Sequence, residues 1–329
     1  MNEEPVDAIA AWSSGLDLEG IHMDISVVIP VYKARKCIRE LHGQLRDSLV
    51  PMAKEFEIIY VDDKCPEGTW DLIQEIARAD ASVKGVRLSR NFGQHQAISA
   101  GLEISTGQYI VVMDCDLQDD PKCIPDLYKE IGSGFDVVLA KWVSKDEPLL
   151  KRMSSRAFYM VLNALCDTSI SDDAGHFGIY SRKVIDAIVQ FRDHTRWLKG
   201  MVGWAGFSVG YLEVKRNKRL DGKSSYSVKK LLNFASEIII LTSNRPLKIL
   251  AVLGLAILSV SLVFVASVVI RYFIGQGSLL GWPSLIVSIW FFSGLIIFAI
   301  GILGLYMGRI YFEVRGRPSY IVNEKTYVP

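Results

Sequence analysis

Two long uncharged runs near the C-terminal end constrain this chain more than any other feature. Residues 249–270 and 285–307 contain no Asp, Glu, Lys or Arg. At about 1.5 Å of rise per residue, a helix of either length crosses the roughly 30 Å hydrocarbon core of a bilayer. Two such runs close together are unusual for the core of a soluble domain, so we expect two transmembrane helices. The hydrophobic fraction of 50% and the mean hydropathy of +0.23 agree with a membrane portion.

Positive charge flanks these runs on one side. The loop between them offers only Arg271, whereas basic residues gather before the first run and after the second: Lys215, Arg216, Lys218, Arg219, Lys223, Lys229, Lys230, Arg245, Lys248, Arg309, Arg315 and Arg317. The positive-inside rule then places both termini and the upstream domain in the cytoplasm. We expect a multi-pass protein of the inner (cytoplasmic) membrane. The basic cluster at 215–230 also indicates an anionic neighbour, either a lipid headgroup or a phosphate.

The remaining composition restricts the compartment. Residues 1–23 are acidic and lack the apolar core of a signal peptide, and we expect them to form an acidic flexible tail. The five cysteines are an odd number with no CxxC pair, which argues against a disulfide framework or a structural zinc site. This usage fits a reducing compartment.

Between residues 24 and 140, short runs rich in β-branched and aromatic residues alternate with segments of helical periodicity. We expect the first strand to stop at Pro30. The expected strands and helices are, in chain order, 25–32, 35–49, 56–61, 69–79, 85–88, 93–104, the strand that carries Asp114, 121–132 and 136–140. Such alternation predicts βαβ units, and therefore an α/β domain with a mostly parallel sheet and helices on both faces.

Three of these strands end in residues suited to a binding site, and ligands of such sheets bind at the carboxyl ends of the strands. The three ends are Pro30-Val31-Tyr32, Asp62-Asp63 and Asp114-Cys115-Asp116. In a strand, Asp114 and Asp116 would point to the same face. Carboxylates are hard ligands for Mg²⁺ or Mn²⁺, so we expect a metal site that grips a diphosphate. The alternative is a polar turn that caps the next helix, with Pro121 in its first turn.

The sequence lacks the glycine-rich phosphate cradles of dinucleotide-binding proteins and of P-loop proteins. A bound diphosphate would therefore need a metal to neutralise it. Two amphipathic segments, 148–166 and 228–244, either pack into a core or lie on a membrane surface. The acidic, glycine-containing segment 171–178 is either a second part of a site or an exposed turn.

At this point the motifs match a known family. The chain resembles the inverting glycosyltransferases of family 2, with the GT-A (Rossmann-like) fold, and among them the polyprenyl-phosphate glycosyltransferases such as bactoprenol glucosyltransferases and dolichyl-phosphate mannose synthases. The resemblance covers about residues 24–320. It is carried by residues 26–32, Val61-Asp62-Asp63, residues 90–94, residues 114–118, residues 219–227 and residues 306–311.

The resemblance implies a division of the chain. A GT-A domain would occupy 24–227, an amphipathic juxtamembrane helix 228–245, two transmembrane helices with a short non-cytoplasmic loop 246–310, and a cytoplasmic C-terminal tail 311–329. Small residues such as Gly294 and Gly301 suit close helix packing within or between protomers, which leaves a homo-oligomer open.

The resemblance also implies site residues. Catalysis would rest on Asp173 and Asp116, with Mg²⁺ or Mn²⁺ held by Asp114, Asp116 and Gln118. The nucleotide sugar would bind Pro30, Tyr32, Asp62, Asp63, Asn91, Gln94, Asp114 and Lys141. The lipid phosphate would bind Arg152, Arg219, Ser224, Ser225, Tyr226 and Lys229. The chain departs from the family pattern at 33–35, at Lys64-Cys65 and at Cys115.

The implied activity is metal-dependent hexosyl transfer. One sugar, by default glucose, would pass with inversion from a UDP-sugar to undecaprenyl phosphate among the membrane lipids, for cell-surface glycan or lipopolysaccharide O-antigen modification. UDP-GlcNAc, UDP-galactose and GDP-mannose stay open as donors, and no nucleic acid is expected as a partner. The acceptor phosphate is already largely ionised at pH 7, since its second pKa is about 6. Asp173 would therefore position a substrate, with base catalysis as the alternative.

Two other classes of protein compete with this interpretation. A processive polysaccharide synthase would carry a Q-x-x-R-W motif, but here Gln190 lies too far before Arg196-Trp197. Two membrane helices would also make a poor conduit for a polymer. A non-catalytic lipid- or nucleotide-binding scaffold would not need Asp114, Asp116 and Asp173 to be intact.

Overall fold

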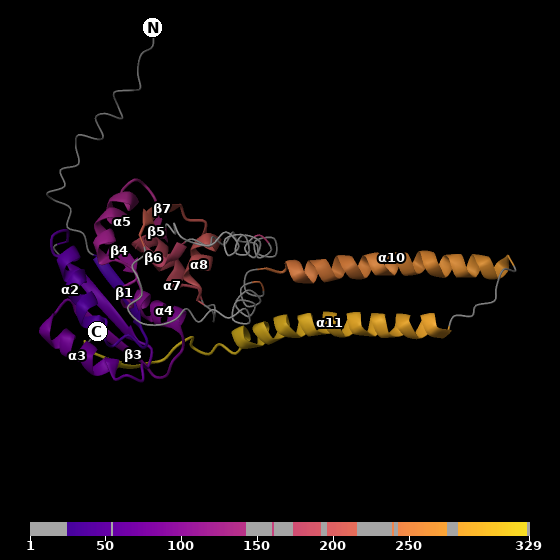
Figure 1. Cartoon of the computed structure of the whole chain (residues 1–329), viewed down its shortest axis with the longest axis horizontal. Helices are drawn as coiled ribbons and strands as arrows, with labels where there is room; N and C mark the ends of the chain where they lie inside the picture. The colour runs from indigo at the N-terminus through magenta and orange to yellow at the C-terminus, as the bar shows by residue number, and fades with distance from the viewer. Residues whose placement is uncertain are drawn as a thin grey trace, which may run out of the picture.

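The computed structural model describes residues 25–53, 55–142, 174–191, 196–215, 243–274 and 282–327, together with residues 160 and 239. Figure 1 shows an α/β domain from which two long helices, α10 (Arg245–Phe273) and α11 (Trp282–Val314), extend side by side. The expected segments 148–166 and 228–244 lie outside the described residues, apart from residues 160, 239, 243 and 244.

One eight-stranded sheet organises the domain. Its strands are β1 (Ile25–Val31), β2 (Phe56–Asp62), β3 (Val83–Leu88), β4 (Tyr109–Val112), β5 (Val137–Trp142), β6 (Ala174–Ser181), β7 (Val209–Val214) and β8 (Val322–Lys325). They lie in the order β7-β5-β6-β4-β1-β2-β3-β8. The pairs β1–β2, β1–β4, β2–β3 and β5–β7 are parallel, whereas β6 and β8 run antiparallel to their neighbours. The prediction of a mostly parallel α/β sheet is confirmed.

Helices cover both faces of this sheet. One core cluster unites α2 (Ile38–Leu49), α3 (Thr69–Ala79), the short 3₁₀ turn η1 (Pro121–Cys123) and α5 (Ile124–Ile131). The other unites α4 (Gln94–Ile104), α7 (Arg182–Val189) and α8 (Leu198–Ala205). Strand β1 serves both, because Val27 and Ile29 point to the first cluster and Val28 to the second. Helix α4 lies so close to β1 that a Cβ on Gly101 would come within 2.4 Å of Val28.

The first strand continues through Pro30, so the expectation that Pro30 would stop it is wrong. Strand β4 ends at Val112, opposite Val28, and the Met113 N–H donates to the Val28 carbonyl at 3.2 Å. Residues two apart in a strand direct their backbone groups to the same side. The missing N–H of Pro30 therefore faces the side on which β4 has already ended, and no ladder hydrogen bond is lost.

The sheet also recruits the end of the chain. Strand β8 pairs with β3, with Arg87 opposite Glu324. It belongs to the segment that the sequence assigned to a C-terminal tail, 311–329. In Figure 1 the chain leaves the end of α11, returns along the domain and ends beside α3 and β3.

The long helices contain the two uncharged runs. Within the described residues, one segment, Phe292–Val314, is long and apolar enough to cross a membrane, with a mean hydropathy of 1.9 and none of it buried. Helix α10 is continuous over the other run, and its role as a second span stays a prediction.

Candidate active site

The carboxyl ends of β1, β2 and β4 meet around one cavity of about 400 Å³, a size suited to a small-molecule ligand. Seven residues that the sequence singled out lie in its wall: Pro30, Tyr32, Asp63, Asn91, Gln94, Asp114 and Asp116. Val31, Gly93, Ala97 and Cys115 complete the lining. Residues far apart in the sequence are thus brought together at this edge of the sheet.

The acidic run after β4 is a folded turn. Because β4 ends at Val112, the expectation that Asp114 and Asp116 share a strand face is wrong. The turn instead folds back on itself. The buried Asp119 accepts the Asp114 N–H at 3.0 Å, and Asp116 accepts the Gln118 N–H at 3.1 Å. This local folding, rather than strand periodicity, directs Asp114 and Asp116 to the same cavity.

The alternative of a helix-capping turn also holds, for a different member of the run. Asp120 Oδ1 accepts the Lys122 N–H at 3.0 Å at the start of η1, with Pro121 at the first position. The acids of this run therefore have two different roles. Asp114 and Asp116 line the cavity, while Asp119 and Asp120 hold the turn.

The start of α4 forms a second wall. Gln94 Nε2 donates to Asp114 Oδ1 at 2.6 Å, which links this helix to the acidic turn. Gly93 precedes the helix with φ +108°, a conformation that favours glycine. Since Gly93 and Gln94 both line the cavity, the positive end of the α4 dipole faces it. Such a helix end favours a bound anion.

Asp63 fixes the loop that leads into α4. Its two carboxylate oxygens accept the N–H groups of Phe92 at 2.7 Å and Gly93 at 2.9 Å. Burial raises the pKa of the Asp63 carboxyl, and these two donors oppose the rise without cancelling it. The carboxyl therefore both lines the cavity and shapes its wall.

Three residues that the resemblance placed at the donor or the metal are not among those that line the described cavity. Asp62 is fully buried behind it, and its Oδ1 accepts the Cys65 N–H at 2.9 Å. Lys141 lies on β5 opposite Ala174. Gln118 sits in the acidic turn, where its N–H is used by Asp116.

Backbone strain gathers at the same edge. Among the described residues, the non-glycine positions with positive φ are Lys33 (55°), Lys64 (54°) and Leu117 (62°). They follow the ends of β1, β2 and β4, one after each strand. Left-handed conformations cost non-glycine residues roughly 1–2 kcal/mol each and cluster at functional sites.

A pair of histidines was missed in the sequence. His95 on α4 and His176 on β6 stack edge to face, with ring centroids 5.1 Å apart at 81°. Burial lowers both pKa values, that of His176 to about 3, so both rings are neutral at pH 7. The one signal available was the position of His176 three residues after Asp173. Asp173 itself lies outside the described residues, as do Arg152, Arg219, Ser224, Ser225, Tyr226 and Lys229.

The cavity has the carboxylates for a cation that is held partly by the protein and partly by the phosphates of a bound substrate. In the described part of the chain, no group of three or more His, Cys, Asp or Glu side chains is arranged to hold a metal ion. Mg²⁺ typically uses one or two carboxylates, with water and substrate phosphate at its other positions. The carboxylates of Asp114 and Asp116 in one wall fit that chemistry. They do not form a closed all-protein site.

Comparison with known proteins assigns the family. The model described as "Glycosyl transferase family 2" matches residues 26–189. The SfII prophage-derived bactoprenol glucosyl transferase of Shigella flexneri is 33% identical over 303 residues, 92% of this chain and 98% of the relative. The uncharacterized glycosyltransferase YkcC of Bacillus subtilis is 33% identical over 307 residues, 93% of this chain and 95% of the relative.

A crystal structure of S. aureus TarS 1–349 in complex with UDP-GlcNAc is 20% identical, covers 68% of each chain and has a TM-score of 0.45, which is too distant to inform the site. The near full-length matches to the sequence relatives decide the assignment. This chain belongs to glycosyl transferase family 2, and its α/β domain has a GT-A-like fold.

Proposed function

We propose that this protein transfers a single sugar from a UDP-sugar to polyprenyl phosphate, with inversion, at the cytoplasmic face of the inner membrane. The observation that carries the proposal is the cavity lined by Asp114 and Asp116, at the edge where α/β sheets bind ligands. The full-length similarity to a bactoprenol glucosyl transferase supports the lipid acceptor, and glucose as the default sugar.

The donor would bind across the three strand ends. Tyr32, which is 43% exposed at the cavity, offers a ring face for a nucleobase beside Pro30 and Asn91. The diphosphate would lie toward the N-terminal end of α4 and the acidic turn. Asp114 and Asp116 would hold Mg²⁺ or Mn²⁺, and Gln94 orients the Asp114 carboxylate. When bound, the ion supplies charge that stabilises the leaving diphosphate.

The acceptor needs orientation more than activation. A phosphate monoester is largely ionised at pH 7. We therefore assign Asp173 to positioning the acceptor or the donor sugar, with base catalysis as the alternative. The basic segment at 215–230 would offset repulsion between two phosphorylated substrates, with Arg152, Arg219, Ser224, Ser225, Tyr226 and Lys229 as its lipid-phosphate ligands.

The membrane part would deliver that acceptor. We infer that α10 and α11 both span the bilayer, with the juxtamembrane segment 228–245 at its surface. In Figure 1 the start of α10 and the end of α11 lie at the domain, and the end of α10 and the start of α11 lie far from it. Arg309 and Arg315 stand at the domain end, as the positive-inside rule requires. The product would serve cell-surface glycan or O-antigen modification.

Radiolabelled UDP-sugars incubated with undecaprenyl phosphate and MgCl₂ test the proposal on the purified full chain. A lipid product that carries one sugar supports it. A polymer would indicate a processive synthase, and no turnover with any UDP-sugar or GDP-mannose would indicate a scaffold. Metal dependence is tested by EDTA followed by Mg²⁺ or Mn²⁺, with recovery of turnover expected.

A further inference from the structure

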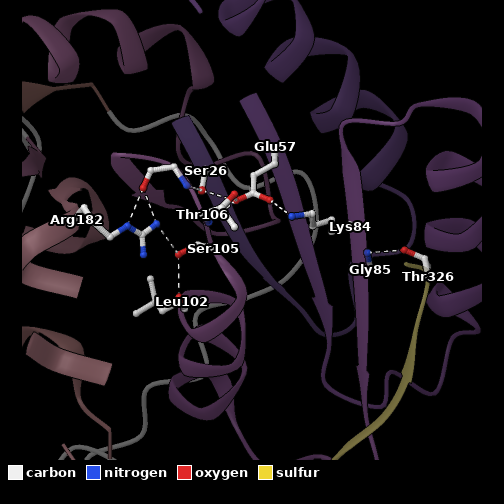
Figure 2. Close-up of polar contacts among 10 residues, drawn as sticks. Ser26, Glu57, Lys84, Gly85, Leu102, Ser105, Thr106, Arg182 and Thr326 are labelled. Atoms are coloured by element: carbon white, nitrogen blue, oxygen red, sulfur yellow. Dashed lines mark hydrogen bonds and ion pairs between the residues drawn. The ribbon is translucent and has the colours of Figure 1, made fainter. Parts of the chain in front are cut away.

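The C-terminal strand makes specific contacts with the catalytic domain. Besides its ladder with β3, the Thr326 N–H donates to the Gly85 carbonyl at 3.0 Å. The Gly85 N–H in turn donates to Thr326 Oγ1 at 2.8 Å, as Figure 2 shows. A strand of four residues with side chains in defined contacts is a docked element of the fold.

Glu324 is the polar centre of this docking. Trp70 Nε1 donates to Glu324 Oε2 at 2.8 Å, and Arg87 Nη1 lies 3.0 Å from Glu324 Oε1. The Arg87 guanidinium also lies 6.0 Å from the centroid of the Trp70 ring. Together, a carboxylate and an aromatic ring restrict where the Arg87 side chain can go.

Arg87 also contacts Asp62, at the end of β2. Arg87 Nε lies 3.4 Å from Asp62 Oδ2, and the Asp62 side chain is fully buried. Burial raises the pKa of Asp62, and the positive charge of Arg87 opposes that rise. A buried carboxylate that loses its cation is strongly destabilised. Together with the hydrogen bond from the Cys65 N–H, the position of Arg87 therefore stabilises the charged form of Asp62.

Asp62 in turn holds two loops of the cavity. Its Oδ1 accepts the Cys65 N–H at 2.9 Å, and Cys65 Sγ accepts the Lys33 N–H at 3.2 Å. Both loops contain a strained residue, Lys64 after β2 and Lys33 after β1. Their immediate neighbours Asp63 and Tyr32 line the cavity.

We propose that Glu324 is a positioning residue for the donor site. Docking of β8 holds Arg87 against Asp62, and this keeps the loops after β1 and β2 in the conformation that binds the nucleotide. The segment that follows the second long helix thus helps to shape the donor pocket, although Glu324 lies 237 residues after Arg87 in the sequence. The inference rests on the proposed function, because it assumes that the cavity binds a UDP-sugar.

The test measures KM and kcat for UDP-glucose, and binding of UDP with MgCl₂, on the full chain in detergent. Glu324→Gln should raise the donor KM and the Kd for UDP about three- to tenfold, with kcat within about twofold of wild type. Arg87→Gln should do the same, and the double variant should be no worse than Arg87→Gln alone, because both act through one route.

Two controls separate this route from a loss of stability. Thr326→Val removes the hydrogen bond from Gly85 but leaves Arg87 untouched, so it should lower the unfolding temperature while leaving the donor KM within about twofold. Glu75→Gln removes a carboxylate from an exposed pair with Arg39 and should change neither quantity.

The outcomes distinguish the two proposals. Unchanged donor KM in Glu324→Gln, or an equal rise in Thr326→Val, would overturn the positioning role while wild-type transfer stands. A wild-type chain that neither binds UDP nor transfers sugar would overturn the proposed function, and the positioning role with it.

Discussion

The two edges of the central sheet handle buried polar groups in opposite ways. At the amino ends of the strands, the buried Glu57 accepts hydrogen bonds at Oε1 and forms an ion pair at Oε2 (Figure 2). Ser26 Oγ donates to it at 2.6 Å, Thr106 donates through its N–H at 2.6 Å and its hydroxyl at 2.9 Å, and Lys84 Nζ lies 2.5 Å from Oε2. Burial alone would raise the pKa of Glu57, but these partners outweigh it and the pKa is lowered.

The network around Glu57 continues across the same edge. The Gly107 N–H donates to Ser26 Oγ at 2.8 Å, and Arg182 Nε donates to the Gly107 carbonyl at 2.8 Å. These bonds tie the loop before β4 to the residue that follows β6. Among the described residues at this edge, no non-glycine residue has a positive φ. The amino edge therefore stabilises the fold.

The carboxyl edge has the opposite character. Burial raises the pKa values of Asp62 and Asp63, so their charged forms are held at a cost in stability. Lys33, Lys64 and Leu117 are held in left-handed conformations there. At the carboxyl edge, buried carboxylates and left-handed backbone conformations lower the stability of the fold. At the amino edge, the buried carboxylate is stabilised by its partners. This difference indicates that the carboxyl edge is shaped for binding rather than for stability.

The largest expected effect is at the acidic turn. Asp114→Asn and Asp116→Asn should each lower kcat/KM for sugar transfer by about a thousandfold, because each removes charge from the metal and diphosphate site. Their unfolding temperatures should stay close to that of wild type. Asp120→Asn, which alters only the cap of η1, is the matched control and should keep its activity. An inactive Asp120→Asn variant would contradict this division of the acidic run.

At the other edge the effect should fall on stability. Glu57→Gln should lower the free energy of unfolding by about 2 kcal/mol, because it leaves Lys84 without its charge partner inside a buried network. The kcat/KM of the folded protein should not change. Denaturant unfolding of the full chain in detergent measures the first quantity. If Glu57→Gln keeps the free energy of unfolding of wild type but loses sugar transfer, the amino edge serves function rather than stability.

Relief of strain should produce a smaller change with the opposite sign. Lys64→Gly should raise the free energy of unfolding by about 0.5 kcal/mol, since glycine accepts a φ near 54° without steric cost. Lys122→Gly, in the ordinary backbone of η1, should instead lower it by a similar amount. If both substitutions destabilise the protein equally, Lys64 stores no strain.

The smallest effect concerns pH. The folded pKa of Glu57 lies below its unfolded value near 4.5, so its contribution is complete above that pH and is lost as pH falls through the folded value. The folded pKa values of Asp62 and Asp63 are raised, so their contribution to the free energy of unfolding falls as the pH rises through those values. The stability difference between wild type and Glu57→Gln should therefore be constant above about pH 4.5 and shrink as the pH falls below that value. A difference that is constant with pH would show that charge at Glu57 is irrelevant.

Local periodicity was sufficient for much of the fold. Helix α3 occupies the predicted residues 69–79, because its apolar positions recur at helical spacing and their burial needs only a neighbouring sheet. The convergence of three strand ends also followed from the sequence, since parallel strands share one carboxyl edge. The family assignment rested on short motifs whose order along the chain is specific.

Several features of the site depend on pairing between distant segments. The end of β4 is set by its register with β1, so strand periodicity could not direct Asp114 and Asp116. The buried position of Asp62 depends on Arg87 and Cys65, which no spacing in the sequence connects. The His95–His176 contact joins a helix to a strand, and the position of His176 close to Asp173 in the sequence does not reveal its partner on α4.

By itself, the sequence determined the α/β architecture, the family and the residue types at the carboxyl edge, because these follow from local periodicity and from short motifs. Only the tertiary structure decided which acids face the cavity, which brace it, and that the end of the chain docks beside Arg87. A four-residue strand such as β8 has too little local preference to be recognised in the sequence. It forms because the edge of β3 offers backbone hydrogen bonds, and because Trp70 and Arg87 donate hydrogen bonds to the Glu324 carboxylate.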